Sequence, residues 1–262
     1  MGHERIGFLP TTKPWTKVVE QVSSFSGKEE EISRVAKTTL DNVQSRFKYI
    51  ENDGGVISAF HFLVLYALAG RSEDPIAFLA KYGINLSQRP SIIEISKEVS
   101  KIITDNIHSK EYAALAKSSA IDAISEWQLK HSIVQSSLFS TDINKEQWKK
   151  ASYGSGFCEI ARLFFASFTE RYLKYFLERA ASSTINSVYE RELFNDRLES
   201  HVNDISRHAF DTAKITQSFA AGWFNKNTKE GVPTERMTKN FLRKAFSKMR
   251  SEILIQGEVI NG

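Results

Sequence analysis

Two histidines and a neighbouring arginine are the residues of this chain best suited by type to acid–base chemistry. His201 and His208 are seven residues apart, so a helix would place them on one face, and Arg207 directly precedes His208. Helical ribonucleases of the HEPN type carry an arginine and a histidine at a longer spacing than Arg197–His201 or Arg207–His208. The chain therefore misses this motif, and a HEPN-like nuclease or toxin that uses His201 and His208 is kept only as an alternative hypothesis. Histidines hydrogen-bonded to packed neighbours are the simpler interpretation.

Cys158 and the glycines before it form a second candidate site. Cys158 is the only cysteine, so no intramolecular disulfide can form. It would lie in the first turn of a helix, where a thiolate is stabilised, but it belongs to an apolar stripe, where cysteine acts as a small hydrophobe. The segment Tyr153-Gly154-Ser155-Gly156 has the elements of an anion site but lacks the Lys-Ser/Thr ending of a P-loop. We interpret Ser155 as a helix N-cap and Cys158 as a core residue.

The sequence contains no pattern typical of a metal or cofactor site. Di-iron bundles need Glu-x-x-His on facing helices, and this motif is absent. Zinc sites need cysteines and histidines at short spacing, which one cysteine and scattered histidines do not provide. We therefore predict no metal, no cofactor and no catalytic residue, and we expect a non-enzymatic protein.

Basic residues are concentrated near the C-terminal end. The chain of 262 residues has a net charge of +4, and the stretch 226–250 alone contributes +6, so the remainder is −2. Its eight basic residues are Lys226, Lys229, Arg236, Lys239, Arg243, Lys244, Lys248 and Arg250. They could bind the phosphates of DNA or RNA without reading bases, contact an acidic partner subunit, or form a solvated helix face.

Apolar residues recur at helical spacing along nearly the whole chain, and glycine and proline separate the segments. Pro75 in a first turn and a capping box formed by Ser91 and Glu94 mark two of the helix starts. The expected helices cover residues 28–49, 56–68, 75–82, 91–106, 110–135, 141–148, 155–182, 184–201, 202–224 and 234–255, and residues 15–22 could form a further short helix.

The helix over 155–182 has the broadest apolar face, which is rich in phenylalanine. We expect this face to be core, and an exposed edge of it would indicate a protein–protein interface. In the last helix, lysines and arginines are expected to face outward. Its expected inward residues are Met237, Phe241, Ala245, Met249 and Ile253.

These patterns predict an all-α protein, an irregular bundle of about eight to ten helices with an irregular N-terminal arm over residues 1–14. We expect one helical domain over 1–262, with residues 151–156 as the alternative boundary between two lobes. No apolar run reaches the roughly 20 residues that span a bilayer, and the N-terminus lacks the layout of a signal peptide, so a cytoplasmic location without membrane contact is expected.

The chain has many helix faces that could contact other proteins, and it has no chemical motif. This combination favours an interaction or scaffold subunit. We expect it to belong to a bacterial multi-protein complex and to have other protein subunits as partners. Phage defence is one process suggested by the segment 167–225. A sequence-nonspecific nucleic-acid-binding module that uses the basic residues is the second hypothesis.

Overall fold

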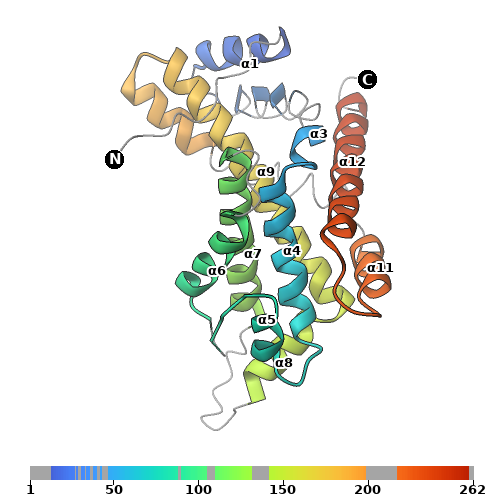
Figure 1. The fold of residues 1–262 in the computed structure, drawn as a ribbon. Coiled ribbons are helices and arrows are strands. Elements are labelled where there is room, and N and C mark those ends of the chain that lie inside the picture. Colours follow the sequence, from blue (N-terminus) through green and yellow to red (C-terminus); the bar gives the residue numbers. More distant parts are fainter. Residues whose placement is uncertain are drawn as a thin grey trace.

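A computed structural model describes residues 13–26, 47–87, 90–104, 110–131, 142–198 and 217–259, and residues 28, 31, 32, 34, 35, 38, 39 and 42 between the first two ranges. Within these residues the regular structure is helical and no strand occurs, which confirms the predicted all-α, irregular multi-helix bundle (Figure 1). None of the described helices combines the length and apolar character needed to cross a membrane.

The N-terminal helices lie beside the central part of the bundle. α1 (Lys13–Ser23) starts before the predicted end of the arm, because a proline at its second position fits the first turn of a helix. The remaining arm residues, 1–12, lie outside the described part of the chain. In the predicted helix over 28–49, the described residues between 31 and 42 are helical, and α3 covers Phe47–Ile50.

α4 (Gly54–Ala69) lies at the centre of the bundle (Figure 1). The Asp53 carboxylate accepts a hydrogen bond from the Val56 backbone N–H over 3.1 Å and caps the first turn. Nearly all residues of α4 are buried, because several other helices contact it. A helix that is apolar on every side can only be stable in such a position.

α7 (Lys110–His131) and α9 (Gly154–Thr184) run antiparallel beside α4. Their polar contacts show the direction: His131 at the end of α7 bonds Glu159 near the start of α9, and Asp122 bonds Arg171 further along. α6 (Ile92–Thr104) contacts both α4 and α7.

The aromatic face of α9 is buried, as predicted. Phe60 of α4 lies among its rings, with centroids 5.2 Å from Phe164 and 5.4 Å from Phe165. Phe241 of α12 (Glu235–Val259) stacks on Phe60 at 5.3 Å. Each fully buried phenylalanine stabilises the fold by about 1.5–3 kcal/mol. The buried aromatic residues of α9 are Phe157, Phe164, Phe165, Phe168, Tyr172 and Phe176. This face therefore does not form an exposed interface.

Two predicted helix starts are confirmed by their hydrogen bonds. Asp74 accepts from the backbone N–H groups of Ile76 and Ala77, each at 3.0 Å, at the start of α5 (Pro75–Ala80). At α6, Glu94 accepts from the Ser91 backbone N–H at 2.7 Å, and Ser91 Oγ accepts from the Glu94 N–H at 3.2 Å, which completes the capping box.

The turn from α8 (Asp142–Ala151) to α9 is tight because it contains glycine. A Cβ on Gly156 would lie 2.1 Å from the Lys150 carbonyl oxygen, and one on Gly154 would lie 2.8 Å from the Asn225 amide nitrogen. The prediction that Ser155 is the N-cap is wrong: α9 starts at Gly154 and Tyr153 is the cap residue, without a side-chain hydrogen bond. Of the two glycines, Gly156 is the more tightly constrained, because its neighbour is a backbone atom.

The C-terminal helices α11 (Gln217–Asn227) and α12 cover the other flank of the bundle (Figure 1). Phe241 and Ala245 are buried, as predicted, and Met237 is partly buried. The inward face is wider than predicted, because Thr238, Leu242 and Phe246 are buried as well. The side chains of Met249 and Ile253 lie outside the described residues. Buried residues from α1 to α12 form one contiguous cluster.

Candidate functional site

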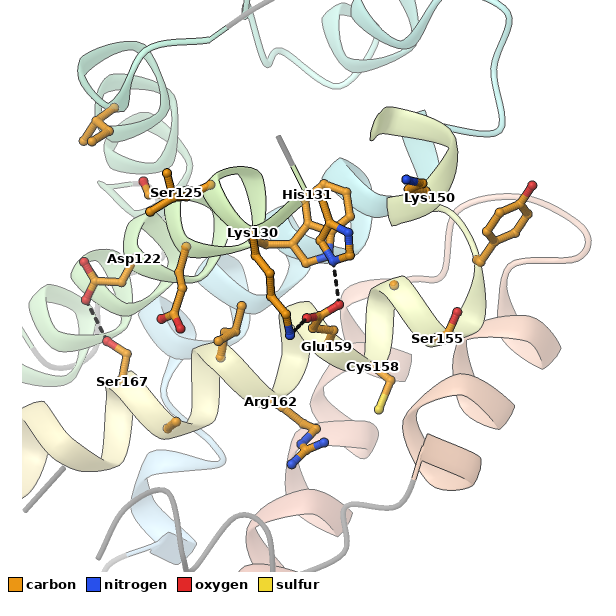
Figure 2. Close-up of a pocket in the computed structure, with 18 of the residues that line it drawn as sticks. Asp122, Ser125, Lys130, His131, Lys150, Ser155, Cys158, Glu159, Arg162 and Ser167 are labelled. Carbon is orange, nitrogen blue, oxygen red and sulfur yellow. Dashed lines mark hydrogen bonds and ion pairs between the residues drawn. The ribbon is translucent and has the colours of Figure 1, made fainter. Parts of the chain in front are cut away.

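A groove runs between α7 and α9 and encloses about 1040 Å³ (Figure 2). We call it the α7–α9 groove. α7 and α9 supply most of its walls, and the start of α6 and the end of α8 close its sides. Apolar side chains that line it include Ile92, Trp127, Leu129, Tyr153, Cys158, Leu163 and Ala166.

An ion-pair cluster lies in the middle of the groove and connects its two walls. Glu159 of α9 accepts from His131 Nε2 at 2.8 Å and from the Lys130 ammonium group, both on α7 (Figure 2). Burial alone would raise the pKa of Glu159, but the hydrogen bonds from Lys130 and His131 lower it below its ordinary value. The cluster therefore holds a carboxylate that braces α7 against α9.

A second polar contact lies at the far end of the groove. Asp122 Oδ2 accepts from Ser167 Oγ at 2.7 Å and from two nitrogens of Arg171 at 2.6 and 2.9 Å. Figure 2 shows the Asp122–Ser167 contact at one end and Lys150 and Ser155 at the other. Both polar clusters join α7 to α9, so the walls of the groove are held at a fixed separation.

Exposed apolar side chains surround the mouth of the groove. Leu129 is 76% exposed, Ile92 60% and Tyr153 51%, and they come from α7, α6 and the α8–α9 turn. Burying such side chains is favourable, so apolar surface that gathers around a concavity marks a place where a partner binds.

Some buried polar groups of the wall lack an internal partner. Ser125 Oγ and Trp127 Nε1 both belong to residues that line the groove, and neither has a hydrogen-bond partner within the described residues. The Trp127 ring also lies against the His131 ring, with centroids 4.7 Å apart. Buried donors are normally satisfied, so these two groups are exceptions within the described residues, and both lie beneath the surface of the groove.

Cys158 is buried in the groove wall, 3% exposed, as expected for a core cysteine. Burial raises the pKa of its thiol, although the neighbouring Arg162 acts in the opposite direction. The thiol is therefore protonated near neutral pH, which is the opposite of what an activated nucleophile requires.

The basic residues predicted to face outward lie on α11, the following loop and α12. Those whose side chains the structure describes are all exposed: Lys226, Lys229, Arg236, Lys239, Arg243, Lys244 and Lys248. Lys248 Nζ lies 5.0 Å above the Phe219 ring and so also covers an aromatic group. The side chain of Arg250 lies outside the described residues.

The histidines considered for acid–base chemistry, His201 and His208, lie outside the described residues, as does Arg207. Within the described part of the chain, no group of three or more His, Cys, Asp or Glu residues could hold a metal ion.

The α7–α9 groove itself was not predicted from the sequence. Lys130 and His131 are about 28 positions from Glu159, and only the antiparallel packing of two helices brings them together. One signal was present in the sequence: Leu129 is a large apolar residue between Gln128 and Lys130, off the helical spacing of Ala123 and Trp127.

Comparison of the chain with known protein families, with curated proteins and with solved structures finds no match in any of the three. The geometry of the groove and of the basic surface therefore carries the functional proposals below.

Proposed function

We propose that the protein is a non-enzymatic helical subunit of a bacterial multi-protein assembly, and that the α7–α9 groove receives a segment of a partner subunit. The observation that carries the proposal is that three exposed apolar side chains, Ile92, Leu129 and Tyr153, line a concavity between two helices that polar contacts join. A partner that inserts an apolar side chain there would remove them from water.

Two charged residues that line the groove, from different helices, support a defined orientation of the partner. Glu126 of α7 and Lys150 of α8 line the groove, and no ion pair engages either of them within the described residues. A partner segment with a basic residue near Glu126 and an acidic residue near Lys150 would match both. Such complementary charges select the partner and its direction more than they add affinity.

The experiment is size-exclusion chromatography with light scattering, using the full chain and the proteins encoded by the genes adjacent to its own. We expect a stable complex with at least one of them. Leu129→Glu should weaken this complex at least tenfold, because it places a charge in the apolar rim. Val188→Glu is the matched control, since Val188 is also an exposed apolar residue on a helix, at 60%.

Two results would count against the proposal. One is a chain that stays monomeric with every neighbouring protein. The other is a complex that Leu129→Glu and Val188→Glu weaken equally. Circular dichroism of both variants checks that folding is unchanged, as expected for substitutions of exposed helix residues.

A further inference from the structure

The exposed basic residues of α12 form a surface that the proposed partner groove does not use. We call Arg236, Lys239, Arg243 and Lys244 the α12 cationic face. All four are exposed, and they recur at three-, four- and seven-residue spacing along one helix. Lys226 and Lys229 extend the surface toward α11.

We propose that the α12 cationic face binds the phosphate backbone of a nucleic acid without reading its sequence. The four charges are not used to stabilise the fold of the described residues. Some cations elsewhere in the described residues pair with carboxylates, as in Lys101–Glu98 and Arg171–Asp122. No ion pair engages the four residues of the α12 cationic face within the described part of the chain, so their charge is available to a polyanion.

The α12 cationic face is also held in place by the packing of its helix against the core. Phe241, Leu242, Ala245 and Phe246 on the opposite side of α12 are fully buried. Thr238 Oγ1 also lies 3.0 Å from His61 Nδ1 of α4, which ties the start of α12 to the central helix. Binding would therefore require no ordering of the backbone in this part of the helix, which lowers its entropic cost.

The spacing of the positive charges along α12 also matches the spacing of phosphates along a nucleic-acid strand. From Arg236 to Lys244 the helix rises about 12 Å at 1.5 Å per residue. A single strand of duplex DNA carries one phosphate per roughly 3.4 Å, so three or four phosphates occupy the same length. Lysine and arginine at this density contact phosphates, and such contacts position a nucleic acid without specifying its bases.

The composition of the surface distinguishes a nucleic acid from a membrane. A helix that binds a bilayer surface inserts exposed apolar side chains between the headgroups. The exposed positions of α12 between 235 and 248 are all polar or charged: Glu235, Arg236, Lys239, Asn240, Arg243, Lys244 and Lys248. The apolar residues of this stretch are buried, or partly buried in the case of Met237, so no exposed apolar side chain is available for insertion.

The test measures binding of the full chain to a fluorescent 20-base-pair DNA duplex and to a single-stranded RNA of the same length, by anisotropy, between 50 and 200 mM salt. We expect affinity to fall steeply with salt, with a slope in log–log form of about −3 to −5 for the duplex. The triple variant Lys239→Gln, Arg243→Gln, Lys244→Gln should lose about tenfold or more in affinity, and its slope should become shallower by two to three.

The control variant is Lys17→Gln, Lys81→Gln, Lys149→Gln. It removes three exposed positive charges from other parts of the surface and so has the same net charge as the triple variant. We expect its affinity to stay within twofold of the wild type, and Leu129→Glu should also bind normally, because the partner groove is a separate surface.

Three results would overturn the proposal. They are no binding to DNA or RNA at 50 mM salt, equal losses in the two triple variants, and binding to anionic phosphatidylserine vesicles that exceeds binding to both nucleic acids. None of these results would bear on the groove, so the two proposals fail independently.

Discussion

Arg71 donates a hydrogen bond from Nη1 to the main-chain carbonyl oxygen of Thr228 over 2.9 Å and so joins the end of α4 to the loop between α11 and α12. Its Nε also lies 3.4 Å from the Ser152 carbonyl, and its guanidinium lies 4.8 Å from the centre of the Phe224 ring. One side chain therefore fixes the α8–α9 turn and the α11–α12 loop to the central helix.

Replacing Arg71 should loosen the connection before α12. We expect Arg71→Met to lower the free energy of unfolding by about 1–2 kcal/mol, because a charged donor to two carbonyls is lost. Arg71→Lys should recover only part of this, since a single ammonium group cannot reproduce the planar fork. Urea denaturation measures both, and hydrogen exchange should show faster exchange near Thr228. Unchanged exchange there would contradict the assigned role.

Two glycines should not tolerate a methyl group. A Cβ on Gly70 would lie 1.8 Å from the Trp148 carbonyl oxygen, and one on Gly156 would lie 2.1 Å from the Lys150 carbonyl oxygen. Because both contacts are with backbone atoms, Gly70→Ala and Gly156→Ala should each destabilise the protein by about 3 kcal/mol or more, or prevent folding.

Gly222 provides the matched control for these substitutions. It lies within α11, and nothing is within 4 Å of the position its Cβ would take. Gly222→Ala should raise the free energy of unfolding by about 0.5–1 kcal/mol, because alanine is the better helix former. Thermal denaturation of the three variants checks the order, and a destabilised Gly222→Ala would show that α11 packs differently.

The partly buried His61 should make stability depend on pH. Burial lowers the pKa of His61 below its ordinary value, and Glu235 opposes this only in part. The unfolded chain therefore takes up a proton near pH 6.5 that the folded chain does not bind, so stability decreases as the pH falls from about 7.5 to 5.5.

The variant His61→Asn isolates this contribution. Asparagine offers a polar group for Thr238 but does not titrate. We expect its stability to change less than that of the wild type between pH 7.5 and 5.5, as measured by urea denaturation. Parallel pH profiles for the two proteins would rule out His61 as the source.

Local features of the fold could be predicted because they depend on neighbouring residues. The helix start at Pro75, the capping box at Ser91 and the buried aromatic face of α9 all follow from spacing and residue type. Ser155 was mispredicted as the N-cap: α9 starts at Gly154, where a Cβ would meet side chains of α11, and this contact joins segments far apart in the chain. No local pattern encodes that contact.

The same distinction, between local patterns and contacts of distant residues, explains which candidate sites could be predicted. The exposed lysines and arginines of α12 could be predicted because amphipathic periodicity alone places them outward. The inward face of α12 is wider than its periodicity predicts, because α12 packs against more than one neighbour. Phe241 stacks on Phe60 of α4, and the Phe246 ring contacts the Phe165 ring of α9. The α7–α9 groove depends on which helices pair, and periodicity does not contain that information.

The most direct test of the central claim places a photo-reactive benzoylphenylalanine at position 129, in the rim of the groove, and at position 188 as the control. After irradiation of the assembled complex, we predict a cross-link from position 129 to one partner chain and none from position 188. Peptide mapping should place the attachment in a segment that carries an apolar side chain. A complex that forms normally but gives no cross-link at position 129, or equal cross-linking at both positions, would contradict the account.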